Sequence, residues 1–227
     1  MENDESERSS AKLKRVEARP NNFEISDGSP KGLAIAVSAP SGTGKTTLCR
    51  MVTSEFKDIK PSISYTTRQM RPGEADGISY NFINDSEFDR MIKTDQFVEW
   101  AIVFGKRYGT AYKSLLAGGS SYDVLLEIDV QGVENLIRYF NKIGKSEQLV
   151  TIFIVPPSHD ELVNRLLKRG DVTGGELEVR LKTAYGELEK KTMYEYIITN
   201  DDLDAAFSKL KSVIIAERCR NRKKIGL

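Results

Sequence analysis

The chain has 227 residues, which is enough for one domain with a sizeable core and small inserted parts. Hydrophobic residues (39%) and charged residues (30%) occur in the proportions of a globular protein, and a formal net charge of +1 provides no overall attraction to nucleic acid or to an acidic membrane. No apolar run approaches the roughly 20 residues of a membrane span, and the two cysteines lie outside metal-binding spacings, as in a reducing cytoplasm. We therefore expect a cytoplasmic protein that binds neither nucleic acid nor membrane, and these numbers leave its oligomeric state open.

Residues 1–30 are polar and mixed in charge, and they end in an Asp-Gly-Ser-Pro sequence. Such a segment buries too little apolar surface to fold alone, so we expect a mobile tail with at most a transient helix. A partner-binding arm is the alternative. The folded domain should occupy residues 31–227.

The next stretch joins an apolar run, a small-residue loop and the start of a helix. Residues 33–37 are apolar and β-branched enough for a buried strand, and residues 48–52 have the apolar positions of a helix. The loop between them contains Gly-Thr-Gly-Lys-Thr, and a strand, a Gly-rich loop, Lys-Thr and a helix in this order are typical of a phosphate-binding P-loop. Backbone N–H groups and the positive end of the helix attract phosphate oxygens at such a loop.

The P-loop predicts an ATP site in which Lys45 reaches the β- and γ-phosphates and the Thr46 hydroxyl lies on Mg²⁺. The predicted site residues are Pro40, Ser41, Gly42, Thr43, Gly44, Lys45, Thr46 and Thr47. Ala39 departs from the pattern, because it stands where a glycine is usual and must avoid the left-handed backbone region. An ordinary turn before a helix is the alternative.

Residues 61–112 show short strand patterns and little helix, which indicates a small insertion on a main sheet. Pro72 and two glycines keep residues 66–77 out of a helix. The predicted elements are strands at residues 80–83 and 97–104, a helix capped by Asp85 or Ser86, and a turn over residues 105–110.

The remainder of the chain alternates between strand and helix patterns. The predicted strands are residues 124–129, 149–155 and 196–200, and the predicted helices are residues 130–140, 176–191 and 202–218 and one capped by Ser158. Residues 170–175 are glycine-rich and should form a flexible interruption. We therefore predict an α/β fold, with a parallel sheet flanked by helices and ligands at the carboxyl ends of its strands.

Two arginines of the insertion, Arg68 and Arg71, lie three residues apart on a non-helical loop. Planar guanidinium groups bind phosphate oxygens bidentately, so both can converge on one phosphate. Tyr80 and Tyr108 can add hydroxyl donors to the same group. The alternative is a solvated basic loop tied to neighbouring acids such as Glu74.

Glu99 lies within an apolar strand pattern, where a carboxylate is costly unless a donor meets it. Guanine offers two adjacent donors, N1–H and the exocyclic amine, and the hydroxyls of Ser64 and Thr110 are candidates to meet its O6. Adenine presents an unprotonated N1 instead, a mismatch that can support discrimination of roughly 10⁴ or more. The alternative is that strand alternation turns Glu99 to solvent.

Three further arginines, Arg165, Arg169 and Arg180, surround the glycine-rich segment 170–175. Phosphoryl transfer needs positive charge on the moving group and exclusion of water, and arginines beside a flexible lid can supply both. The alternative is a solvated helical face paired with acids such as Glu161. We favour this alternative for Arg165 and leave the choice open for the other two.

Together these motifs resemble those of the guanylate kinases, the ATP:GMP phosphotransferases, from about residue 33 to the last helix. The matching motifs are PSGTGKT at 40–46, SYTTR at 64–68, RPGE at 71–74, DG at 76–77, YNF at 80–82, FVEWA at 97–101, YGT at 108–110, IDVQG at 128–132, PPS at 156–158, RG at 169–170, RL at 180–181 and NDDL at 200–203. Each motif is weak alone, whereas their joint occurrence in this order is specific.

The resemblance implies a core over residues 31–60, 120–168 and 192–227, a GMP-binding insertion over about 61–112 and a lid over about 169–190. It implies catalytic roles for Lys45, Arg169 and Arg180, and it adds Asn200 to the residues that bind ATP with Mg²⁺. The implied GMP-binding residues are Ser64, Arg68, Arg71, Glu74, Tyr80, Glu99, Tyr108, Thr110 and Asp129.

Three functions are compatible with these motifs. The first is transfer of the ATP γ-phosphoryl group to GMP, and to dGMP, in purine nucleotide metabolism. The second is a guanylate-kinase-like module that binds phosphopeptides without catalysis; the intact P-loop and the lid arginines argue against it. The third is a related kinase acting on another small phosphate ester, and Glu99 with Ser64 and Thr110 argues against that.

Overall fold

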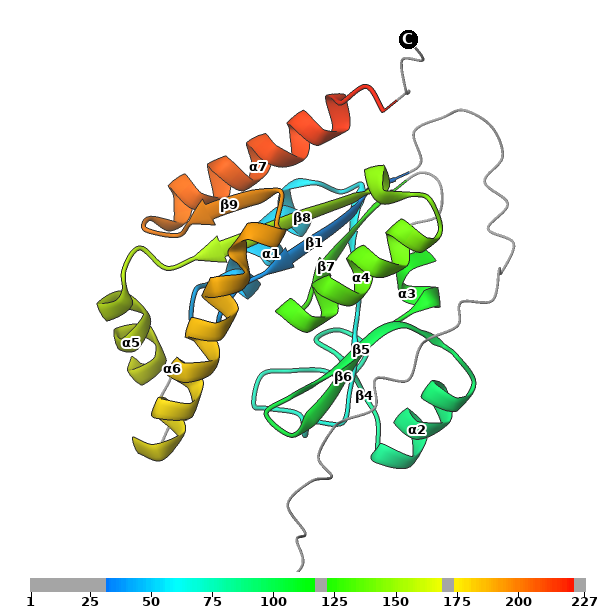
Figure 1. The fold of residues 1–227 in the computed structure, drawn as a ribbon, viewed down its shortest axis with the longest axis horizontal. Helices are drawn as coiled ribbons and strands as arrows, with labels where there is room; N and C mark the ends of the chain where they lie inside the picture. Colours follow the sequence, from blue (N-terminus) through cyan, green and yellow to red (C-terminus); the bar gives the residue numbers. More distant parts are fainter. Residues whose placement is uncertain (1–31, 117–121, 169–173, 223–227) are drawn as a thin grey trace, which may run out of the picture. The chain divides into compact units, whose positions relative to one another are not determined.

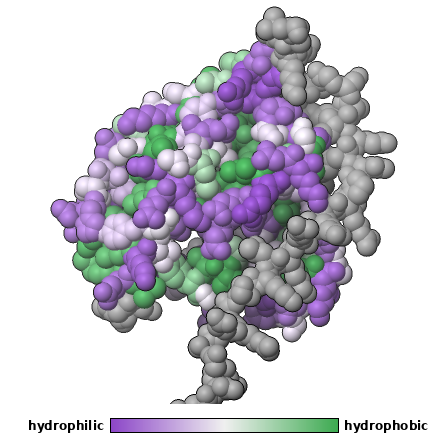
Figure 2. All heavy atoms as spheres, viewed as in Figure 1, coloured by the Kyte–Doolittle hydropathy of each residue, from purple (hydrophilic) through white to green (hydrophobic). Residues whose placement is uncertain are grey.

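The computed structural model describes residues 32–116, 122–168 and 174–222 (Figure 1). The predictions for residues 1–30 and for Arg169 lie outside these ranges. Within them, no helix is both long enough and apolar enough to cross a membrane. Figure 2 shows that polar residues cover most of one face and that hydrophobic residues form smaller patches between them.

A parallel sheet of five strands, in the order β2-β7-β1-β8-β9, forms the centre of the fold. The strands are β1 (Ala34–Ser38), β2 (Ile59–Pro61), β7 (Asp123–Glu127), β8 (Leu149–Val155) and β9 (Tyr196–Thr199). All five residues of β1 are buried, because helices cover both faces of a parallel sheet. This arrangement confirms the predicted fold class.

Strand alternation distributes the core between the two faces of this sheet. Ile35 and Val37 of β1 pack with α1 (Lys45–Glu55) and α7 (Leu203–Cys219), whose buried residues include Leu48 and Leu210. Ala34 and Ala36 face the other side and pack against α4 (Val130–Lys142) through Val133, Leu136 and Phe140. Figure 1 shows α4 and α7 on opposite sides of the strands.

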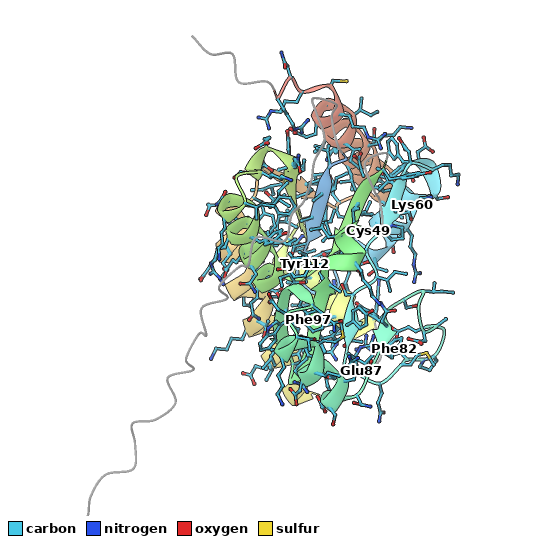
Figure 3. The ribbon with its side chains drawn as sticks, turned by 90° about the vertical axis from the view of Figure 1, so that its right-hand side faces the viewer. Cys49, Lys60, Phe82, Glu87, Phe97 and Tyr112 are labelled. Carbon is cyan, nitrogen blue, oxygen red and sulfur yellow. The ribbon has the colours of Figure 1, made fainter. Side chains whose placement is uncertain are left out.

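A second, mixed sheet of four strands has the order β4-β3-β6-β5. Its strands are β3 (Tyr65–Thr66), β4 (Asn81–Phe82), β5 (Phe97–Val103) and β6 (Lys106–Ala111), and α2 (Asp85–Lys93) packs on it. Phe88 stacks on Phe97 at a centroid distance of 4.6 Å and closes a separate small core. In Figure 3, Cys49 and Lys60 mark the main-sheet half, whereas Phe82, Glu87 and Phe97 mark the second-sheet half.

Two local predictions for this region are wrong. Residues 106–110 belong to β6, and the turn is confined to Phe104 and Gly105, whose φ angles are 49° and 72°. Positive φ at both central residues gives a tight turn whose twist suits a hairpin, so pairing with β5 continues directly after it. Helix α2 is capped by Asn84, whose side chain accepts a hydrogen bond from the Glu87 N–H at 2.8 Å, rather than by Asp85 or Ser86.

The remaining helical elements flank the strands of the main sheet in the chain order. They are α3 (Tyr112–Leu116), α5 (His159–Lys168), α6 (Gly174–Glu189) and the short 3₁₀ turns Ser146–Gln148 and Lys190–Met193. The Ser158 hydroxyl accepts from the Glu161 N–H at 3.2 Å, as predicted for a cap. Helix α6 begins at Gly174, so the last two residues of the predicted interruption at 170–175 are helical, and residues 170–173 lie outside the described ranges.

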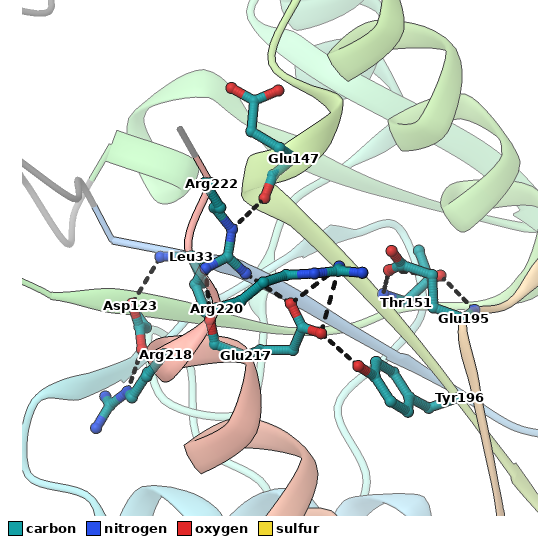
Figure 4. A network of polar contacts seen from close by, with 10 residues as sticks. All are labelled: Leu33, Asp123, Glu147, Thr151, Glu195, Tyr196, Glu217, Arg218, Arg220 and Arg222. Carbon is teal, nitrogen blue, oxygen red and sulfur yellow. Dashed lines mark hydrogen bonds and ion pairs between the residues drawn. The ribbon is translucent and has the colours of Figure 1, made fainter. Parts of the chain in front are cut away.

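The end of α7 is held by a polar network around the buried carboxylate of Glu217 (Figure 4). This carboxylate accepts hydrogen bonds from the Tyr196 hydroxyl and, at 2.6 Å, from Nη2 of Arg222. Arg220 reaches it at 3.4 Å, and Arg218 binds Asp123 at 2.7 Å. The described arginines of the basic C-terminal stretch are thus paired with acids of the fold.

We expect Glu217→Gln to lower the free energy of unfolding by about 3 kcal/mol, because it leaves the largely buried Arg222 without its counter-charge. Urea unfolding followed by circular dichroism measures this change. Arg220→Gln is the matched control, since this side chain is 58% exposed and its loss should cost about 1 kcal/mol or less. Equal effects of the two substitutions would contradict a buried, charge-dependent anchor.

Candidate active site

A cavity of about 760 Å³ opens at the carboxyl ends of the main strands. The loop after β1, residues from both strands of the β5–β6 hairpin, and helix α6 all contribute to its wall. Ligands of open α/β sheets bind at this edge, where successive strands send their loops. Most of the residues singled out from the sequence line this one cavity.

The loop between β1 and α1 has the backbone that a P-loop requires. Gly42 and Gly44 have φ angles of 88° and 91°, which side-chain-bearing residues rarely adopt. A Cβ atom on Gly44 would also lie 2.5 Å from Nδ2 of Asn200. Both the backbone angle and the lack of space therefore require glycine at this position. Ala39 is not among the described residues with positive φ, which explains how alanine is tolerated there.

The first residues of α1 point their side chains toward the end of β7. Lys45 donates from Nζ to the carbonyl oxygen of Ile128 at 2.9 Å, and the Thr46 hydroxyl donates to Glu127. All four residues line the cavity. Glu127 was not among the site residues predicted from the sequence. The pairing of β1 with β7, which sets Glu127 opposite Val37, brings it to the P-loop.

Asn200 is buried next to the P-loop and does not line the cavity. Its amide donates to the carbonyl oxygen of Thr43 at 2.6 Å, and its own backbone carbonyl accepts from Nη2 of Arg165 at 3.1 Å. Arg165 is also paired with Glu161 at 2.7 Å, as the favoured alternative predicts, and it nevertheless lines the cavity.

The basic loop of the second sheet faces the same cavity through Arg68, Arg71, Tyr80 and Tyr108. Arg68 is bound to Glu74 at 2.7 Å, and Glu74 also accepts from the Arg71 N–H at 2.8 Å. The pairing with Glu74 therefore does not remove either arginine from the cavity, since Glu74 binds the side chain of Arg68 and the backbone of Arg71 while both arginines line it. Burial raises the pKa of Tyr80 to about 12, so its hydroxyl remains a donor at neutral pH.

Glu99 is 6% exposed, so the alternative in which its side chain points to solvent is excluded. A β-bulge between Phe97 and Glu99 shifts the pairing, after which Glu99 lies opposite Thr110. Glu99 and Ser64 line the cavity, and Thr110 is fully buried beside them. Burial raises the pKa of the Glu99 carboxyl to about 7, and the nearby charge of Asp129 adds to the rise.

Asp129 begins α4 as its N-cap and accepts from the Gly132 N–H at 2.8 Å. A Cβ atom on Gly132 would lie 3.0 Å from a carboxylate oxygen of Asp129 and 3.0 Å from one of Glu99. Both carboxylates thus lie close to Gly132, and both residues line the cavity. Burial raises the pKa of Asp129.

Helix α6 contributes Val179, Arg180 and Glu187 to the opposite wall. Arg180 and Glu187 are seven residues apart and therefore share one face of the helix. Burial raises the pKa of Glu187 to about 7. Arg180 was predicted from the sequence and Glu187 was not, although its seven-residue spacing from Arg180 was a signal for it.

The donors beside the P-loop fit the magnesium ion that the sequence motif implies. The Thr46 hydroxyl, Glu127 and Asp129 offer oxygen atoms, which Mg²⁺ prefers. The described residues contain no group of three or more His, Cys, Asp or Glu side chains able to hold a metal ion. The few oxygen donors at this place suit Mg²⁺, which is usually held by one or two protein groups together with substrate phosphates.

These features define an α/β protein with a P-loop, in which one cavity also contains arginines, tyrosines and a buried carboxylate. The profile of the family described as guanylate kinase matches residues 31–217. A guanylate kinase of Caldanaerobacter subterraneus subsp. tengcongensis is 46% identical over 191 residues, covering 84% of this chain and 90% of the relative. One of Desulfitobacterium hafniense is 44% identical over 196 residues, covering 85% and 94%.

The crystal structure of guanylate kinase from Anaplasma phagocytophilum superposes with a TM-score of 0.68 at 29% identity, covering 87% of this chain and 92% of that one. The chain belongs to the guanylate kinase family.

Proposed function

We propose that this protein transfers the γ-phosphoryl group of ATP to GMP, and to dGMP, and releases ADP and the nucleoside diphosphate, in purine nucleotide metabolism. The observation that carries the proposal is that Glu99, a buried carboxylate facing the cavity, shares that cavity with the P-loop Lys45. The buried acid suits a guanine base, and Lys45 suits the phosphates of the donor. One cavity thus holds groups for both substrates.

GMP, the acceptor, is oriented by residues that bind its base and by residues that bind its phosphate. Glu99 accepts from N1–H and the exocyclic amine of guanine, with Ser64 and Thr110 near O6 and Asp129 beside the base. Arg68 and Arg71, held by Glu74, bind the phosphate together with Tyr80 and Tyr108. Fixing base and phosphate places one phosphate oxygen in line with the γ-phosphorus and removes the entropy cost of alignment.

An oxygen of the GMP phosphate attacks the γ-phosphorus of ATP, and the bond from that phosphorus to the β–γ bridging oxygen breaks as ADP leaves. The attacking oxygen is already anionic, so no protein base is required. The P-loop residues from Pro40 to Thr47 hold the donor, with Asn200 supporting the loop. Lys45 stabilises charge that develops on the bridging oxygen, and Arg180 and the predicted lid residue Arg169 stabilise the moving phosphoryl group.

Mg²⁺ bound with ATP would supply further positive charge at the β- and γ-phosphate oxygens, and Thr46 and Glu127 are the residues that would hold it. We place the enzyme in the cytoplasm, a location supported by the free thiols of Cys49 and Cys219. The catalytically silent phosphopeptide-binding module is not favoured, because such a module has no need of a P-loop with Lys45 and Thr46 facing the cavity.

A coupled assay of ADP release with GMP, dGMP, AMP, CMP and UMP tests the proposal. We expect turnover with GMP and dGMP to exceed turnover with the other three by at least about 100-fold, because only guanine matches the buried carboxylate. Comparable use of AMP would reject the assignment of the base. No ADP release with any acceptor would reject the enzyme and favour the binding module.

A further inference from the structure

Lys106 is a cation that faces the cavity and that the proposed mechanism does not use. It is the first residue of β6 and follows the tight turn at Phe104 and Gly105. The register sets Lys106 directly opposite Val103, and both residues line the cavity. The position of Lys106 is therefore fixed by a regular hairpin rather than by a long loop.

Strand alternation identifies which face of the hairpin Lys106 occupies. Residues 106, 108 and 110 of β6 share one face, because successive side chains point to opposite sides. Thr110 lies opposite Glu99 at the base-binding end, and Tyr108 belongs to the phosphate-binding group. Lys106 continues this row by two residues, about 7 Å beyond Tyr108.

The other face of the hairpin carries Arg107, which serves a different purpose. Arg107 binds Asp85 at 2.6 Å and Asp89 on α2. These acids are thereby neutralised on the side away from the cavity. The side chain of Lys106 forms no ion pair or hydrogen bond with the described residues. Asp85, the acid whose pKa its charge affects, is already bound by Arg107.

Helix α6 lies across the cavity from this hairpin and contributes Val179 and Arg180 to the wall. In Figure 1 the hairpin formed by β5 and β6 extends toward α6. An anion held by Tyr108, Arg68 and Arg71 therefore has Lys106 as its next neighbour along β6. An ammonium group is a compact charge on a flexible stem of four carbons, so it can reach a phosphate oxygen from this distance.

We propose that Lys106 is a further substrate-binding residue of the acceptor site and contacts the GMP phosphate alongside Tyr108. The proposal rests on the proposed function, since it requires GMP in the cavity. In this proposal the β5–β6 hairpin supplies one more positive charge to the GMP phosphate. Lys106 thereby differs from the many lysines that are only solvated at the surface.

Titration calorimetry with GMP, using the full chain with wild-type Lys106 and with Lys106→Gln, tests the proposal. We expect the substitution to weaken GMP binding about tenfold, as for loss of one hydrogen bond between charged groups, and to leave guanosine binding within twofold because guanosine has no phosphate. Binding of a non-hydrolysable ATP analogue should also stay within twofold. In 0.5 M KCl the difference between the two proteins should shrink, since salt screens an exposed charge pair.

Lys93→Gln is the matched control, because Lys93 lies on α2 in the same part of the chain, is exposed and does not line the cavity. It removes the same charge and should leave GMP affinity unchanged. Lys106→Arg should restore most of the affinity. GMP affinities of Lys106→Gln and wild type within twofold of each other, or equal losses for guanosine and GMP, would overturn the proposal.

The outcomes also separate this proposal from the proposed function. A wild-type protein that neither binds GMP nor transfers to it would reject both. A wild-type protein that binds and phosphorylates GMP, with Lys106→Gln behaving like Lys93→Gln, would reject the role of Lys106 alone.

Discussion

Replacing Lys45 by methionine should lower kcat by roughly 100-fold or more, because one preorganised donor is removed from charge that develops in the transition state. Methionine keeps the length of the side chain, so the substitution removes the ammonium charge and the 2.9 Å hydrogen bond to Ile128. Steady-state turnover with saturating ATP, Mg²⁺ and GMP measures the effect. A thermal unfolding midpoint within a few degrees of wild type would establish that the fold persists.

Lys57→Met is the matched control for this prediction. Lys57 is exposed shortly after α1, and its ammonium group donates to the backbone carbonyl of Ser54 at 2.6 Å, away from the cavity lining, so turnover should stay at the wild-type level. A Lys45→Met protein that retained half of the wild-type turnover would mean that the donor phosphates bind elsewhere.

Glu99→Gln should lower kcat/KM for GMP by roughly 100-fold or more, because one charge-assisted hydrogen bond is lost and a buried N–H of the amide faces a guanine donor. The ratio of kcat/KM for GMP to that for AMP should fall, since Arg68 and Arg71 still hold either phosphate. The ratio is measured for both proteins at one pH and one Mg²⁺ concentration. Glu87→Gln, at an exposed position on α2, should leave it unchanged.

The same pair of proteins should differ in pH dependence. Burial raises the pKa of Glu99 to about 7, so in the free protein the neutral acid predominates below this pH and the carboxylate above it. Only the carboxylate accepts from both guanine donors, so kcat/KM for GMP should rise with pH through 7 in the wild type. Glu187, with a pKa of about 7, and the GMP phosphate titrate in both proteins, so the difference between the profiles isolates Glu99. A ratio and a profile unaffected by the substitution would assign guanine recognition to other groups.

Elements defined by their own residues were predictable from the sequence. The apolar run at residues 149–155 coincides with β8, because a strand buried on both faces needs no alternation. The P-loop was predictable because its glycines and Lys45 act within a few residues of one another. The sequence favoured a buried Glu99 only through the match between its carboxylate and the guanine donors. The strand pattern could not show the burial, since the bulge before Glu99 depends on pairing with β6.

Features that depend on distant partners escaped prediction. Residues 105–110 contain two glycines and suggested a turn, yet cross-strand pairs with β5 make most of them a strand. Strand β2 has exposed Lys60 and Pro61, and it is held by pairing with β7 and by the burial of Ile59 in the main core. Glu127 and Glu187 reach the cavity from elements far from the P-loop in the sequence, so local patterns gave them no role.

The bond between Asn200 and Thr43 has a consequence for the order in which the protein acquires activity during synthesis. The two residues are 157 positions apart, and the amide of Asn200 occupies the space beside Gly44. A nascent chain therefore exposes its P-loop sequence long before the residue that braces it has been made. The P-loop therefore acquires its full set of supporting hydrogen bonds only after Asn200 has been synthesised and β9 has joined the sheet.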